Sequence, residues 1–144
     1  KKMFKRGYGD GLLDLYRMND AQYAIAGMGT LCSTAKVVVD KLRKEGIKAG
    51  VIRIKSYRPF PSDDLAKAAK KLKGLAVMDR DISVGYEGAL YSEIRSALCD
   101  EHSKVSKIDG FILGLGGKDI TPEHLESAIR DMISKKSKKE QWLF

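Results

Sequence analysis

The chain has 144 residues, of which 43% are hydrophobic and 32% charged, as expected for a single soluble domain with a real core. No apolar run approaches the roughly 18 to 20 residues that cross a bilayer, so neither a membrane span nor a membrane partner is expected. The formal net charge is +8, but residues 1–6 carry +4 and residues 135–144 carry +3, which leaves +1 for residues 7–134. A protein that binds nucleic acid would carry its basic residues along one face of the folded domain, so nucleic acid is not an expected partner.

Cysteine and histidine are too few and too scattered for a metal site. Cys32 and Cys99 form no C-x-x-C pair, and His102 and His124 each lie near an expected helix end. The spacing therefore argues against iron–sulfur or structural zinc sites within this chain. Two lone thiols fit a reducing compartment, so we expect a cytoplasmic protein.

The first half of the chain alternates strand and helix. Residues 23–28 (YAIAGM) read as a short buried strand, and the apolar residues that follow Gly29 have the i, i+3, i+4, i+7 spacing of a helix that ends at Gly46. Residues 51–55 (VIRIK) predict a second strand. Ser62 is the expected N-cap of the next helix.

The second half repeats this pattern. Residues 75–79 (LAVMD) predict a third strand, followed by a helix that starts near Glu87. Residues 108–113 predict a fourth strand. A glycine-rich loop then leads to a helix with Thr121 as N-cap and Pro122 at the first helical position.

Strands that alternate with helices through short connections predict an α/β fold. Right-handed crossovers place helices on both faces of the sheet, so we expect a three-layer α/β/α sandwich with a mainly parallel sheet of four to five strands. Residues 20–134 would form this domain. Residues 1–19 are interpreted as a linker from a preceding domain, and residues 135–144 as a basic tail that carries Trp142 and Phe144.

The turn after the first strand admits a second interpretation. Gly27 and Gly29 stand where a dinucleotide-binding fingerprint would place glycines, and Arg53 and Lys55 on the second strand would suit an NADP-type ribose phosphate. The third glycine of the fingerprint is replaced by Cys32, for which a small buried residue is the favoured role over a nucleophile. If no dinucleotide binds here, Gly27 and Gly29 only permit a tight turn between the strand and the helix.

The carboxyl ends of parallel strands meet at one edge of a sheet, which is where open α/β folds bind ligands or neighbouring domains. The rigid aromatic stretch 57–61 (YRPFP), the tip of the third strand and the glycine loop 114–119 all belong to this edge. The predicted rim of a domain interface consists of Thr30, Arg58, Phe60, Asp79, Arg80 and Lys118.

Four stretches carry a family resemblance in their order and spacing. They are 20–29 (DAQYAIAGMG), 57–61 (YRPFP), 77–80 (VMDR) and 114–119 (GLGGKD). The chain resembles, from about Phe4 to Met132, the alpha subunit of pyruvate:ferredoxin and related 2-oxoacid:ferredoxin oxidoreductases. The similar part is that subunit's second domain, which is like the transketolase C-terminal domain. Lys118 replaces an arginine that is common in the family, which keeps the charge and loses the planar fork.

The resemblance implies a parent complex that oxidatively decarboxylates a 2-oxoacid to an acyl-CoA, with pyruvate as the expected 2-oxoacid. That complex would use thiamine diphosphate, magnesium and iron–sulfur clusters, and would pass electrons to ferredoxin. The family's catalytic and cofactor-binding groups belong to other domains and subunits, so we expect no catalytic, cofactor or metal residue here. The expected partners are the preceding domain of the same subunit, the beta subunit and the other subunits of the complex.

Two functions therefore follow from the sequence. The preferred one is an accessory, assembly-type domain of a 2-oxoacid:ferredoxin oxidoreductase alpha subunit that is inactive alone. The alternative is a free-standing NADP-type nucleotide-binding domain that uses Gly27, Gly29, Arg53 and Lys55.

Overall fold

A computed structural model describes residues 11–134 and 140–143. Within these residues, one sheet has the strand order β1-β3-β2-β4-β5-β6. The strands are β1 (Leu13–Tyr16), β2 (Tyr23–Met28), β3 (Ala49–Ile54), β4 (Gly74–Asp79), β5 (Lys107–Leu113) and β6 (Glu140–Leu143). The helices are α1 (Leu31–Lys44), α2 (Ser62–Ala69), α3 (Ala89–Asp100) and α4 (Pro122–Ile133), with a 3-10 turn, η1, at Leu115–Gly117.

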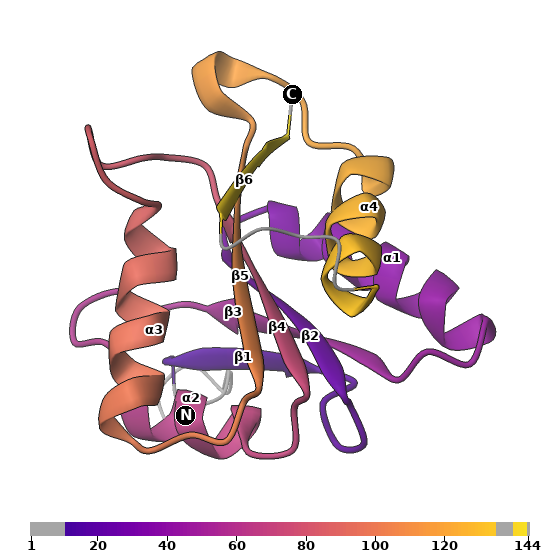
Figure 1. The fold of residues 1–144 in the computed structure, drawn as a ribbon. Helices are drawn as coiled ribbons and strands as arrows, with labels where there is room; N and C mark the ends of the chain where they lie inside the picture. Colours follow the sequence, from indigo (N-terminus) through magenta and orange to yellow (C-terminus); the bar gives the residue numbers. More distant parts are fainter. Residues whose placement is uncertain (1–10, 135–139, 144) are drawn as a thin grey trace, which may run out of the picture.

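The sheet is covered on both faces, as Figure 1 shows. Helices α1 and α4 pack on one face, and α2 and α3 pack on the other. Among the described strands, β1 runs antiparallel to β3 and every other pairing is parallel. The predicted three-layer, mainly parallel α/β/α architecture is confirmed.

Strand β2 is buried on both faces of the sheet. Ile25 faces the core under α1 and α4, while Ala24 and Ala26 face the core under α2 and α3. All three side chains are fully buried. A strand that is buried on both faces reads as a continuous apolar run, which is what made residues 23–28 recognisable.

The number of strands is corrected by the structure. We expected four to five, and the described residues contain six. The additional strands lie in segments that we had assigned to a linker and a tail: Leu13–Tyr16 pairs with β3, and Glu140–Leu143 pairs with β5. Each is a four-residue edge strand, too short for its periodicity to stand out. Residues 1–10, 135–139 and 144 lie outside the described residues, and the domain limits themselves stay a prediction.

Two helix starts also differ from the expected ones. Ser62 is the first residue of α2 and Pro61 holds the cap position, because Pro61 rather than Ser62 has the last non-helical backbone conformation. Helix α3 starts at Ala89 rather than near Glu87. Thr121 caps α4 as expected, since its hydroxyl accepts from the backbone N–H of His124.

The topology creates a switch point between β2 and β4. These strands are adjacent, and the helices that follow them, α1 and α3, lie on opposite faces of the sheet (Figure 1). Their chain paths diverge at the carboxyl edge and leave a crevice there. In open α/β sheets this is the usual place of a functional site.

Phe111 is the largest fully buried side chain of β5 that faces the core under α1 and α4. Replacing it with alanine removes this packing and leaves a cavity. We expect Phe111→Ala to lower the free energy of unfolding, measured by denaturant titration, by about 3–5 kcal/mol. The exposed Val37, changed to alanine, serves as the control, and equal effects of the two substitutions would contradict the described core.

Candidate functional site

A pocket of about 530 Å³ lies at the switch point. Its walls come from the end of β2, the start of α1, the end of β4, the start of α3 and the loop after β3. The lining residues are Met28, Gly29, Leu31, Tyr57, Met78, Asp79, Arg80, Asp81, Ala89 and Leu90. The pocket therefore combines apolar walls with charged groups from the tip of β4.

Asp79 joins β4 to α3 at the base of this pocket. Its two carboxylate oxygens accept hydrogen bonds from the backbone N–H groups of Leu90 and Tyr91, each at 2.9 Å. These are among the N–H groups that a helix leaves unsatisfied in its first turn. The cap residue Gly88 has no side chain that could accept these hydrogen bonds. Asp79, at the end of β4, accepts them instead of an N-cap side chain.

The geometry leaves room for no side chain other than hydrogen at position 88. A Cβ atom there would overlap the carboxyl group of Asp79. Gly88 thus allows the first turn of α3 to approach the tip of β4. An anion arriving at this helix N-terminus would find its N–H groups already engaged by the chain's own carboxylate.

Burial raises the pKa of Asp79 from 3.8 to about 7, although the two backbone N–H groups act in the opposite direction. Only 4% of the residue is exposed. Asp81 lies close enough to hydrogen-bond with Asp79 and also raises its pKa. The carboxyl group therefore changes protonation near neutral pH.

The loop after β3 is fastened to α3. The guanidinium of Arg58 pairs with the carboxylate of Glu93 and lies 4.4 Å from the centre of the Tyr57 ring. Tyr57 and Phe60 make an edge-to-face contact with ring centres 6.1 Å apart. Arg58 itself is exposed, while Phe60 is half-buried against the core under α2 and α3.

The remaining predicted rim residues divide into a buried group and an exposed one. Asp79 is buried and serves as an internal anchor, so its carboxylate is not an outward contact. Thr30 is exposed at the cap position of α1 and makes no side-chain cap bond. Arg80 is exposed beside the pocket, and Lys118 is exposed after η1.

All six rim residues belong to the carboxyl edge of the sheet, as the topology predicts. Of the six, Asp79 and Arg80 line the switch-point pocket. Sequence reasoning missed the apolar lining, above all Met28, Leu31 and Leu90. The signal that could have found them is the topology itself, because they flank the two strands whose helices diverge.

Packing accounts for the glycine turn that suggested a dinucleotide site. A Cβ atom on Gly27 would lie 2.7 Å from Leu31 Cδ1, so the glycine lets α1 pack against the end of β2. Arg53 pairs in register with Gly27 and also with Asp14 of β1. Packing therefore explains Gly27, and the NADP-type interpretation stays a prediction.

Cys32 is a buried core residue, as favoured from the sequence. It is fully buried, and burial raises the pKa of its thiol to about 11. The thiolate that a nucleophile needs is therefore scarce at neutral pH.

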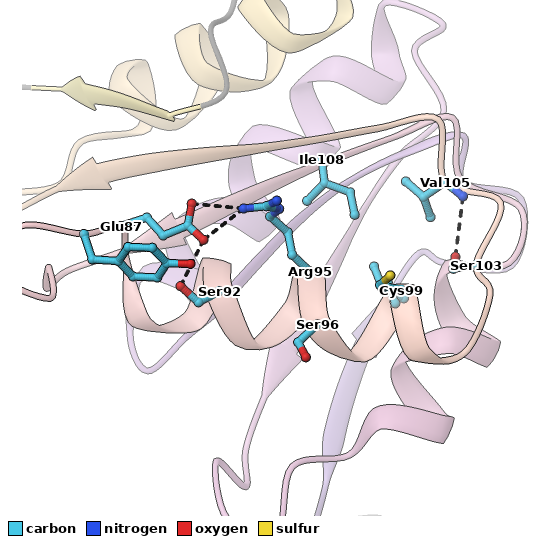
Figure 2. A pocket seen from close by; sticks show the side chains of 10 residues that line it. Glu87, Ser92, Arg95, Ser96, Cys99, Ser103, Val105 and Ile108 are labelled. Carbon is cyan, nitrogen blue, oxygen red and sulfur yellow. Dashed lines mark hydrogen bonds and ion pairs between the residues drawn. The ribbon is translucent and has the colours of Figure 1, made fainter.

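A second pocket, of about 410 Å³, runs along the outer flank of α3 (Figure 2). At one end, Arg95 Nη1 lies 2.9 Å and 3.0 Å from the two carboxylate oxygens of Glu87, and the Ser92 hydroxyl donates to Glu87 at 3.2 Å. Arg95 also lies 5.2 Å from the centre of the Tyr91 ring. Sequence analysis did not identify this cluster, because Glu87 and Arg95 are eight positions apart and only the folded loop brings them together.

Two classes of feature are not found in the part of the chain that the structure describes. There, no three or more histidine, cysteine, aspartate or glutamate side chains come together as metal ligands would. None of the described helices has both the length and the apolar character of a bilayer span.

The fold and the switch-point pocket define a doubly wound α/β domain. Its fold is that of a domain in two solved structures. One is the 2-oxoglutarate:ferredoxin oxidoreductase of Magnetococcus marinus, with a TM-score of 0.67, 19% identity, and coverage of 90% of this chain and 20% of that one. The other is a split-gene transketolase, with a TM-score of 0.68, 17% identity, and coverage of 92% and 45%.

Residues 21–125 match the family described as pyruvate:ferredoxin oxidoreductase core domain II, and the chain belongs to that family. Pyruvate synthase subunit PorA of Methanothermobacter thermautotrophicus is 40% identical over 129 residues, covering 90% of this chain and 32% of that protein. Ketoisovalerate oxidoreductase subunit VorA of Pyrococcus furiosus is 41% identical over 115 residues, covering 80% and 29%. The chain spans about a third of the length of these relatives. The resemblance and the transketolase-like fold inferred from the sequence are thus confirmed.

The pKa of Asp79 makes stability depend on pH. Since that pKa is raised in the folded state, the folded chain holds a proton that the unfolded chain has lost between about pH 4 and 7, so Asp79 stabilises most at low pH. We expect the free energy of unfolding to fall as pH rises from 5 to 8, by up to about 1.4 kcal/mol per pH unit below the folded pKa. Asp79→Asn has no titrating proton and should remove this slope, while its amide oxygen can accept from only one of the two backbone N–H groups. Parallel pH profiles for the two proteins would contradict the assignment.

The close approach of Gly88 to Asp79 gives a second prediction. Gly88→Ala must displace the carboxyl group and loosen the start of α3, at a cost of about 1–3 kcal/mol in unfolding free energy. Ser96→Ala on the exposed side of α3 is the control and should change little. A Gly88→Ala variant as stable as the control would show that α3 does not approach β4 this closely.

Proposed function

We propose that this chain is a non-catalytic assembly domain of the alpha subunit of a 2-oxoacid:ferredoxin oxidoreductase. Its carboxyl-edge rim would contact the preceding domain of the same subunit or another subunit. The family match supports the enzyme class. The relatives' names, pyruvate synthase and ketoisovalerate oxidoreductase, support a 2-oxoacid substrate, and pyruvate is the one we propose.

One observation carries the proposal that the rim binds protein rather than a nucleotide. At the switch point, the N–H groups of α3 are engaged by Asp79, and the space beside Gly27 is filled by Leu31. Two of the N–H groups that a diphosphate would use at the start of α3 are therefore committed to the fold. The cations Arg58, Arg80 and Lys118 remain exposed along the same edge.

The parent complex would act in the cytoplasm with thiamine diphosphate, magnesium and iron–sulfur clusters held by its other parts. Coenzyme A and ferredoxin would be bound by the complex rather than by this domain. The conversion of a 2-oxoacid to an acyl-CoA, with electrons passed to ferredoxin, would therefore depend on this chain only through assembly.

Removing rim charge tests this role. In the full-length alpha subunit, co-expressed with its partner subunits, Arg58→Ala combined with Arg80→Ala should weaken subunit association about tenfold, equivalent to about 1.4 kcal/mol. The matched control is Lys44→Ala combined with Lys71→Ala, which removes two exposed cations at the opposite edge of the sheet. Association is measured by titration of purified subunits, and the melting temperature shows that each variant is folded.

Association that is unchanged in the rim variant and the control alike would refute contact of the rim with another subunit, and an unchanged melting temperature of the full-length rim variant would in addition refute contact with the preceding domain. The nucleotide alternative is tested on the chain itself by calorimetric titration with NADPH. We expect no saturable binding. Micromolar binding that is lost on Arg53→Ala would establish the alternative instead.

A further inference from the structure

Strand β1 determines where the chain enters the described fold. It runs antiparallel to β3 and begins opposite the end of β3, with Leu13 paired to Ile54. The carbonyl oxygen of Leu12 accepts hydrogen bonds from the backbone N–H groups of Lys55, at 2.9 Å, and Ser56, at 3.3 Å. The chain therefore enters at the carboxyl edge of the sheet, where the loop after β3 begins.

This entry point adjoins part of the predicted rim. The loop beside it, residues 55–60 and here called the entry loop, carries the exposed Arg58 and also Tyr57, which lines the switch-point pocket. Within the sheet, only β3 lies between β1 and β2 (Figure 1). Because neighbouring strands are about 4.8 Å apart, the polypeptide that precedes β1 is attached about three strand spacings from the pocket.

A polar cluster fixes β1 to α1. The Tyr16 hydroxyl lies 2.9 Å from each carboxylate oxygen of Asp40, and Arg17 Nε lies 2.6 Å from one of them. On the same face of the strand, Asp14 pairs with Lys36 at 3.1 Å. Asp40 and Lys36 both belong to α1. The strand is therefore held by side chains as well as by its pairing with β3.

The end of β1 is held by a second arginine. Arg43 Nη2 donates to the carbonyl oxygen of Arg17 at 2.7 Å and to the Asp20 carboxylate at 2.8 Å, while its Nε donates to the carbonyl oxygen of Ala49 at 2.6 Å. Arg17 has a φ of +53°, which is uncommon for a residue other than glycine. Such a conformation persists where the surrounding contacts determine it, so the path of the chain on both sides of β1 is fixed.

A fixed entry differs from a flexible linker in what it does to the preceding polypeptide. A flexible linker lets two domains sample many orientations, whereas β1 gives the preceding polypeptide one starting point and direction. A domain tethered by a short connection is present at an effective concentration on the order of millimolar. The chain spans about a third of the length of its relatives, so a protein of their length has room for a preceding domain.

We propose that β1 is a rigid joint that seats the preceding domain of the same subunit on the entry loop, and that the cluster of Tyr16, Arg17 and Asp40 sets the orientation of that domain. This inference rests on the proposed assembly function and names the partner for this part of the rim. The tether favours a domain of the same chain over a separate subunit at this surface, because the two would compete for it.

Photo-crosslinking in the full-length alpha subunit, without its partner subunits, tests which polypeptide lies on the entry loop. Arg58 is replaced by p-benzoylphenylalanine, the subunit is irradiated, and the cross-linked peptides are mapped by mass spectrometry. The cross-links should be intramolecular and should reach residues of the preceding domain. The control places the same probe at Lys44, which is exposed at the opposite edge of the sheet, and should give none to that domain.

The role of the joint is tested on the same subunit with Asp40→Ala, which removes the partner of Tyr16 and Arg17. It should lower the yield of the cross-link from position 58 by about threefold, the size of effect expected for an exposed contact. Lys41→Ala is the matched control, since it removes an ion pair between α1 and Glu126 of α4 and leaves β1 alone. It should leave the yield unchanged, and both variants should melt close to the unaltered subunit.

Three outcomes would overturn the proposal. Intermolecular cross-links, or none, from position 58 would show that the preceding domain does not lie on the entry loop. If the partner subunits, once added, are cross-linked there instead, the assembly role survives with a different partner. A cross-link to the preceding domain that forms equally well in the Asp40→Ala variant would show that β1 is not the joint.

Discussion

The contact between the Asp79 carboxylate and the first turn of α3 is the interaction on which the rest of the carboxyl edge depends. It joins the tip of a central strand to the helix that follows it, across a connection of nine residues, 80–88. Because the acceptor comes from β4 and the donors from α3, the two elements are fixed relative to each other. The switch-point pocket has its shape because this bond holds the start of α3 beside the strand.

The same contact bears on whether the carboxyl edge of this doubly wound sheet binds a phosphate or a protein. Doubly wound sheets commonly bind phosphates at the helix N-termini that surround a switch point. Here one such N-terminus is satisfied internally, and the glycine turn before α1 is packed against Leu31. Charged and apolar side chains on anchored loops are left facing outward, an arrangement that suits recognition of a protein surface.

The sequence predicted those parts of the structure that depend on local pattern. The strand at 23–28 is predicted because burial on both faces produces a run of apolar residues. The helix after Thr121 is predicted because a threonine cap followed by proline is typical of a helix start. The convergence of the rim on one edge followed from topology. The edge strands β1 and β6 were missed, since four residues show no reliable period.

Features that depend on distant residues could not be predicted from the sequence. Asp79 was expected to face outward, and its burial follows only from the approach of α3 over Gly88. The Glu87–Arg95 pair and the turn at Ser83–Tyr86 likewise exist because the connection folds back on α3. Such contacts determine which side chains of a rim are anchors and which remain available to a partner.

The central claim, that the carboxyl edge is covered by protein in the complex, is tested most directly by amide hydrogen exchange. Exchange in peptides that span residues 56–60 and 80–88 would be compared between the free chain and the assembled complex, with residues 44–48 at the opposite edge as an internal reference. The account predicts that both rim peptides become protected on assembly while the reference is unchanged. Rim peptides that exchange equally fast in the free and assembled states would contradict it.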